Sequence, residues 1–270
     1  MRSEENKGEI GTASMGGLAA YCCLQNRLTP RSSPLSPDFR FTPHSSLLTP
    51  HLSMPPAETI VLVPGLWMNA WGMNLLERRF RAAGYGVVDY SYPSISRSPR
   101  ENAADLAGVV GGIDSPAVHF VCHSLGGLLA RHLFHDFPAQ RPGRVVTLGT
   151  PHGPSRSAGR MHRFAPGRLL LGRSVEEGLL GNVPPWAARH ELGSVAGSLG
   201  LGLGRIFPGL PRPNDGTVTV EETRLEGMAD HAVLPVSHFG MLLSPRVAGA
   251  CLDFIRRGRF APVPAGQAKW

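Results

Sequence analysis

The amino-acid sequence predicts an α/β domain with a mostly parallel sheet and helices on both faces, and three observations lead to this prediction. From Thr59 onward, short runs rich in β-branched residues alternate with stretches of helical periodicity, as parallel strands joined by crossover helices do. The 270 residues are 42% hydrophobic and 17% charged, which suits one large core. No second block of alternating strands and helices is left over, so one domain is expected.

The expected elements follow this alternation in order. The first strand, 59–63, is a continuous apolar run, and the first helix, 70–83, has Leu76 and Phe80 at helical spacing with Gly84 just past its end. Further strands are expected at 86–90, 117–122, 144–148, 192–196 and 232–236, and further helices at 101–110, 125–134 and 245–256.

Residues 154–186 interrupt the alternation. Gly, Pro and Arg recur there around apolar patches such as 169–171 and 179–180. Because an insertion between sheet strands at this position often covers an active site, we expect a cap or lid.

The two ends of the chain differ from the domain. Residues 1–53 are rich in Ser, Pro and Thr and show no sustained helical or strand period, so we expect a disordered tail, an unusual targeting peptide or a gene-model extension ahead of a start at Met54. We assign residues 54–260 to the domain and residues 261–270 to a C-terminal tail.

The formal net charge of +7 and the pI of about 9.8 come mostly from arginine. The arginines are scattered and lack the aromatic interleaving of nucleic-acid modules, so we expect a solvated basic surface and no nucleic-acid partner. Peripheral contact with an anionic membrane stays open.

Cysteine spacing and hydropathy indicate the cellular compartment in which the protein is expected. The four cysteines are Cys22, Cys23, Cys122 and Cys251. They match neither a zinc site nor a disulfide framework, and no apolar run approaches the roughly 18 residues of a membrane span. We therefore expect reduced thiols, a cytoplasmic location, and no metal.

The strongest motif is the run 120–127, in which a strand leads through small residues around Ser124 directly into a helix. This is the pattern of a nucleophile elbow, whose strained turn exposes the serine hydroxyl and admits only small residues two places before and after it. Gly126 fits the second place, and Cys122 replaces the glycine usual at the first. The alternative is an ordinary strand-to-helix turn with a capping serine.

A serine nucleophile needs a base, and the base needs an orienting carboxylate. With an elbow of this kind the chain order is Ser, acid, His. His238 lies between the expected last strand and last helix, where the base belongs, and His152, in a loop after a strand, is its rival. The side chain of His123 is expected to point away from Ser124.

Asp215 is the expected acid. It lies in the Asn-Asp-Gly run 214–216, in a loop after the penultimate strand. Simple turn chemistry is the alternative explanation for such a run. Asp230, at the entrance of the last strand, and Asp114, ahead of Ser124, are the fallback candidates.

From about residue 59 to 259 the chain resembles the α/β-hydrolase superfamily, and within it the small bacterial lipase-like serine esterases, including relatives of the inositol-deacylase type. The resemblance rests on the runs 62–66, 122–127, 148–153, 214–216 and 237–238. It implies an α/β-hydrolase fold with the cap inserted at 154–186, and a catalytic triad of Ser124, Asp215 and His238.

The resemblance also implies an oxyanion hole made by the backbone N–H groups of Leu66 and Leu125. Pro64 departs from the His usual two places before Leu66, and a plain Pro-Gly turn is the alternative. The run 148–153 is expected to pack behind the elbow without a catalytic step.

The implied activity is cleavage of carboxylic esters through an acyl-enzyme, without a cofactor. The leucine-rich cap favours medium-chain or lipid-like esters, and its arginines favour anionic interfaces. A thioesterase, amidase or acyltransferase with the same triad stays open, as does a catalytically silent binding protein of the same fold.

Overall fold

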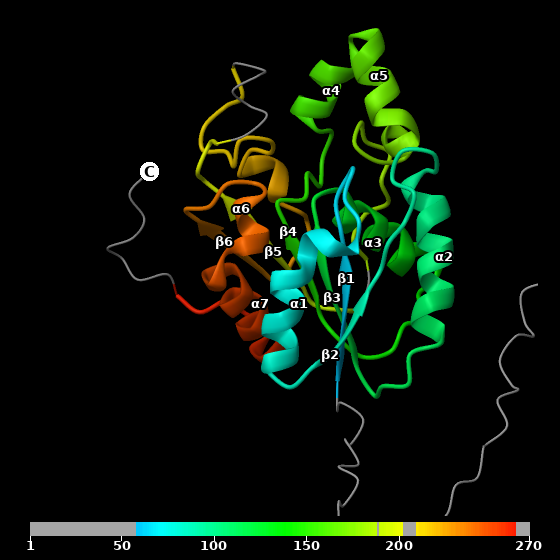
Figure 1. The fold of residues 1–270 in the computed structure, drawn as a ribbon, viewed down its shortest axis with the longest axis vertical. Helices are drawn as coiled ribbons and strands as arrows, with labels where there is room; N and C mark the ends of the chain where they lie inside the picture. Colours follow the sequence, from blue (N-terminus) through cyan, green and yellow to red (C-terminus); the bar gives the residue numbers. More distant parts are fainter. Residues whose placement is uncertain (1–57, 188, 202–208, 263–270) are drawn as a thin grey trace, which may run out of the picture. The chain divides into compact units, whose positions relative to one another are not determined.

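The structure is a computed structural model that describes residues 58–187, 189–201 and 209–262. Its centre is a sheet of six parallel strands in the order β2-β1-β3-β4-β5-β6 (Figure 1). The strands are β1 (Thr59–Val63), β2 (Gly86–Asp89), β3 (Val118–His123), β4 (Val145–Leu148), β5 (Leu192–Gly197) and β6 (Asp230–Leu234). The predicted α/β class is confirmed, and the described sheet is parallel throughout.

Both predicted tails fall largely outside this description. Residues 1–53 lie outside the described residues, as does the C-terminal tail from residue 263 onward. The assignments made for these two segments therefore stay predictions.

Helices cover both faces of the sheet. They are η1 (Ala70–Met73), α1 (Asn74–Ala82), α2 (Pro99–Gly111), α3 (Leu125–Asp136), η4 (Glu221–Thr223), α6 (Gly240–Leu243) and α7 (Pro245–Arg257). Because alternate strand residues point to opposite faces, Val61 and Phe120 pack with α2 and α3, whereas Ile60 and Val121 pack with α1 and α7. None of the described helices has the length and apolar content needed to cross a membrane.

Two of the element boundaries that differ from the prediction have clear local causes. Helix α2 begins at Pro99 because Ser98 and Glu101 each accept the other's backbone N–H, forming a capping box. Strand β6 ends at Leu234, two residues earlier than predicted, because Pro235 has no N–H with which to extend the ladder.

The segment that interrupts the alternation lies beyond the carboxyl ends of the strands (Figure 1). It contains α4 (Arg156–His162), α5 (Ala165–Leu171) and η2 (Gly172–Val175). Buried Arg131 of α3 holds both ends of this segment, because its guanidinium donates to the backbone oxygen of Pro184 near the far end at 2.8 Å and to that of His152, just before the start, at 2.5 Å. Arg173 forms an ion pair with Glu101 at the start of α2.

Two of the buried histidines, His123 and His152, have strongly lowered pKa values. Burial lowers the pKa of His123 from 6.5 to about 3, helped by the neighbouring His238. Burial also lowers the pKa of His152 from 6.5 to about 3, helped by Arg131. The unfolded chain binds protons at these sites below pH 6.5, whereas the folded chain does not, so stability is lost as the pH falls from 6.5 toward 3.

We predict that the free energy of unfolding falls between pH 7 and pH 5, with each buried neutral histidine contributing about 2 kcal/mol of the loss. Urea denaturation at the two pH values measures it. His152→Gln should reduce the difference between the two pH values. Equal pH dependence in the parent and in His152→Gln would contradict the argument.

Candidate active site

Ser124 lies in a sharp turn between β3 and α3, with φ of 51° and ψ of −120°. An L-residue rarely adopts positive φ, so the surrounding contacts must hold the turn. The Ser124 N–H donates to the Leu148 carbonyl at 2.9 Å, and the Thr150 hydroxyl donates to the Ser124 carbonyl at 2.9 Å. These contacts of the run 148–153 are those expected behind a nucleophile elbow.

Glycines allow the loop after β1 to approach this turn closely. A Cβ atom on Gly126 would lie 2.4 Å from the carbonyl oxygen of Val63. A Cβ atom on Gly65 would lie 3.0 Å from Cβ of Ser124. The small residue two places after Ser124 is therefore required by backbone packing against the end of β1.

The two predicted oxyanion donors flank Ser124. Leu66 follows Gly65 and lines the same pocket as Ser124, and Leu125 is the first residue of α3. In the described part of the chain neither backbone N–H donates to another protein group. Both are therefore available to a ligand oxygen.

His238 and Asp215 form a buried pair. His238 Nδ1 lies 2.7 Å from Asp215 Oδ2, and the backbone N–H of His238 donates to the Asp215 carbonyl at 2.8 Å. Asp215 Oδ1 accepts the N–H groups of Thr217 at 2.8 Å and Val218 at 2.7 Å. With both carboxylate oxygens engaged, Asp215 fixes the orientation of the imidazole and directs Nε2 away from itself.

Gly149, at the end of β4, supports this pair from behind. Its φ is +57°, and a Cβ atom there would lie 3.0 Å from both Asp215 Oδ2 and His238 Nδ1. Any side chain at this position would be strained and would press on the atoms that form the contact.

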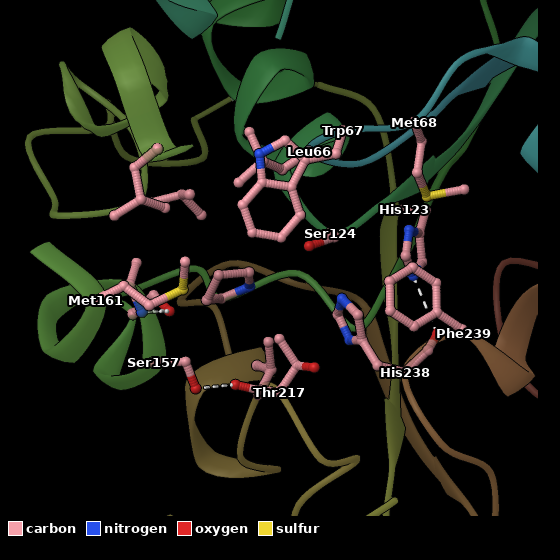
Figure 2. A pocket seen from close by; sticks show the side chains of 16 residues that line it. Leu66, Trp67, Met68, His123, Ser124, Ser157, Met161, Thr217, His238 and Phe239 are labelled. Atoms are coloured by element: carbon pink, nitrogen blue, oxygen red, sulfur yellow. Dashed lines mark hydrogen bonds between the residues drawn. The ribbon is translucent and has the colours of Figure 1, made fainter. Parts of the chain in front are cut away.

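Ser124 and His238 line one pocket, in which the ring of His238 lies beside Ser124 (Figure 2). Segment 154–186, which we call the cap, supplies an apolar wall of this pocket that includes Met161, Leu171 and Leu179. Among the described residues the Ser124 hydroxyl has no hydrogen-bond partner. Catalytic pairs often close only when substrate binds, so this geometry is compatible with transfer of the serine proton to His238.

A sequence model described as the alpha/beta hydrolase family matches residues 60–263. This span is most of the chain and includes the elbow, Asp215 and His238. The chain belongs to the alpha/beta hydrolase family. The predicted α/β-hydrolase fold is thereby confirmed.

Solved structures share the fold of this chain at low sequence identity. Lipase BlEst2 of Bacillus licheniformis in its propeptide form has a TM-score of 0.63 at 22% identity, and the match covers 80% of this chain and 54% of that one. The mature form of this lipase has a TM-score of 0.58 at 21% identity, and the match covers 76% of this chain and 94% of that one. A thermophilic esterase from Thermogutta terrifontis has a TM-score of 0.53 at 16% identity, and the match covers 75% of this chain and 91% of that one. A search of curated proteins found no match.

The rival residues in this chain have other partners. The ring of His152 contacts the Thr147 hydroxyl at 3.1 Å through Nε2 and does not line the pocket. Asp230 accepts the backbone N–H groups of His231 at 2.8 Å and Phe260 at 2.7 Å, and it begins β6 instead of preceding it. No described group of three or more His, Cys, Asp or Glu side chains could hold a metal ion.

His123 is a residue of the site that sequence reasoning missed. It was expected to point away from Ser124, yet it lines the same pocket, and its ring centroid lies 4.7 Å from that of His238. Its Nε2 lies 3.1 Å from the carbonyl oxygen of His238, and its Nδ1 is buried without a partner in the described part of the chain. Because the neutral ring donates from Nε2, it holds the segment that carries His238.

We predict that Gly149→Ala destabilises the hydrolase by about 1 to 3 kcal/mol and weakens the contact between His238 and Asp215, because the new methyl group overpacks that site. The downfield proton NMR resonance of the His238 Nδ1–H would report the contact. Gly153→Ala is the matched control, since a Cβ atom at Gly153 meets nothing within 4 Å. An unchanged resonance in Gly149→Ala would contradict the role given to this glycine.

Proposed function

We propose that this α/β hydrolase cleaves carboxylic esters, with Ser124 as nucleophile, His238 as general base and Asp215 as the orienting acid. The observation that carries the proposal is the 2.7 Å contact between His238 Nδ1 and Asp215 Oδ2, beside the pocket that Ser124 lines. A carboxylate-bound imidazole beside a serine on a strained strand-to-helix turn is the arrangement that activates a serine hydroxyl.

The reaction follows from this arrangement in two halves. His238 Nε2 takes the proton of Ser124 Oγ as the oxygen attacks the ester carbonyl, and the oxyanion binds the N–H groups of Leu66 and Leu125. His238 then gives the proton to the departing alcohol, which leaves an acyl group on Ser124. Water, deprotonated by His238, attacks this acyl-enzyme, and the acid departs as the proton returns to Ser124.

The proposal has support beyond this geometry. The family match spans all the residues involved. The proteins with similar folds include a lipase and an esterase. The same steps would also cleave a thioester or an amide, or transfer the acyl group to an alcohol in place of water. A catalytically silent binding protein of this fold would carry out none of these steps.

We further propose that the substrates are medium-chain or lipid-like esters. The cap wall of the pocket, with Met161, Leu171 and Leu179, suits an acyl chain. Phe164 and Leu169 of the cap are exposed by 61% and 79%, and together with exposed Leu170 they would suit contact with a lipid surface. Arginines on the same segment would contact anionic head groups there.

For the triad, we predict that Ser124→Ala and His238→Ala each lower kcat by about 10⁴-fold or more, with a milder loss for Asp215→Ala. Because the three act as one chemical unit, the loss in the triple variant should be close to that of Ser124→Ala alone. Steady-state hydrolysis of a p-nitrophenyl ester measures these losses.

Asp230→Asn is the matched control for Asp215→Asn. Asp215→Asn should lose most activity, because an amide cannot hold the imidazole as the carboxylate does, whereas Asp230→Asn should keep it. The reverse result would show that the acid is wrongly assigned.

For the substrate class, we predict that kcat/KM rises from acetyl to octanoyl esters, since each buried methylene can contribute up to about 0.8 kcal/mol. Anionic vesicles should raise activity, and salt should reduce this effect. Phe164→Ser should weaken the vesicle effect without changing hydrolysis of a soluble ester. Phe137→Ser, at the far end of α3 from Ser124, is the control.

A steady fall of kcat/KM from acetyl to octanoyl ester, with no response to vesicles, would leave a hydrolase of small esters. If anionic vesicles raised the activity of Phe164→Ser and of the parent equally, the cap surface would not be the part that contacts lipid.

A further inference from the structure

Trp67 occupies a strained position directly after Leu66, the proposed oxyanion donor. The backbone turns at 65–68, where the Met68 N–H donates to the Gly65 carbonyl at 3.3 Å, and Trp67 is the third residue of this turn. Its φ is +60°, a value that glycine adopts freely at this place in a turn and a bulky L-residue does not. Such a conformation persists only where the surroundings impose it.

Two hydrogen bonds impose it, one from the backbone and one from the side chain. The Trp67 backbone N–H donates to Oγ of buried Ser94 at 3.1 Å. The indole Nε1–H donates to the carbonyl oxygen of Leu170 at 2.8 Å. The first bond fixes the peptide that joins Leu66 to Trp67, and the second reaches from this loop to α5 of the cap.

Trp67 also lines the proposed substrate pocket next to Leu66 (Figure 2). The cap residue Leu171 lines the same pocket. The loop and the cap therefore meet at one side chain at the edge of the pocket. A displacement of α5 would act on this side chain before it acted on Ser124, which is held by its own contacts to β4.

We propose that Trp67 is a positioning residue that links the cap to the loop carrying Leu66. While its two hydrogen bonds are made, the strained turn persists, and the Leu66 N–H stays directed to the place of the oxyanion. When the indole bond to α5 is lost, the turn relaxes toward negative φ, the loop moves, and α5 is freed at its edge. The catalytic half of this inference rests on the proposed function, and the structural half does not.

Three variants separate the two bonds. Trp67→Phe removes the indole N–H and keeps a residue strained at φ +60°, so both the cap and the loop should loosen. Trp67→Gly also removes the indole bond to α5, so the cap should loosen. Because glycine favours positive φ, the turn at 65–68 should keep its conformation. Ser94→Ala removes the acceptor of the backbone N–H and keeps the indole bond, so the loop should loosen while the cap holds.

The rate of hydrogen exchange at the α5 amides reports how firmly the cap is held. The kcat for a soluble ester reports how well the loop keeps the Leu66 N–H in place. Exchange over 165–171 should speed up in Trp67→Phe and Trp67→Gly but not in Ser94→Ala. Relative to the parent, kcat should fall about tenfold in Trp67→Phe and Ser94→Ala, and Trp67→Gly should recover most of that loss. Trp71→Phe, a change at another exposed tryptophan, should alter neither quantity.

Unchanged α5 exchange in Trp67→Phe would overturn the link to the cap. A kcat for Trp67→Gly as low as that for Trp67→Phe, or a normal kcat for Ser94→Ala, would overturn the link to the loop. If the parent hydrolyses no ester, the proposed function fails, and the exchange measurement still decides whether Trp67 holds the cap.

Discussion

The site depends on one property of the parallel sheet, which is that its strands deliver their carboxyl ends to a single edge. Ser124 directly follows β3, Gly149 directly follows β4, and His238 lies four residues past the end of β6. Asp215 is farther along its connection from β5, but it is packed against Gly197, the last residue of that strand, where a Cβ atom would lie 2.7 Å from Cβ of Asp215. Residues far apart in sequence thus meet because the strands between them are in register.

Close backbone approach is the second requirement, and it explains why small residues surround the site. Gly126 contacts the end of β1, Gly65 contacts Ser124, and Gly149 contacts the pair of His238 and Asp215. A Cβ atom at each of these positions would lie 3.0 Å or less from a neighbouring atom. The hydrogen bonds of Ser124 to β4 and its neighbouring loop then fix a strained residue at the point where chemistry is proposed.

Local patterns predicted much of this arrangement. The strands are short apolar runs, and the elbow is recognisable because a serine between small residues joins a strand to a helix. His238 and Asp215 followed from the order of a triad along the chain, and the structure brings these two side chains to 2.7 Å. Such features depend on neighbouring residues, so a single sequence contains them.

The parts that were missed depend on contacts between distant segments. His123 packs on His238, which is 115 residues away, and the indole of Trp67 bonds Leu170 across 103 residues. No periodicity or spacing encodes such a contact. The tight space at Gly149 is likewise visible only once the end of β4 and the Asp215 loop are seen together.

The central claim is that Ser124 is the reactive nucleophile of this hydrolase. Labelling of the folded protein with a fluorophosphonate, followed by mass spectrometry of its peptides, tests it most directly. The account predicts a single adduct on Ser124, formed much more slowly in His238→Ala. An adduct on Ser155 or Ser157, which line the same pocket, or a folded protein that resists the probe, would contradict it.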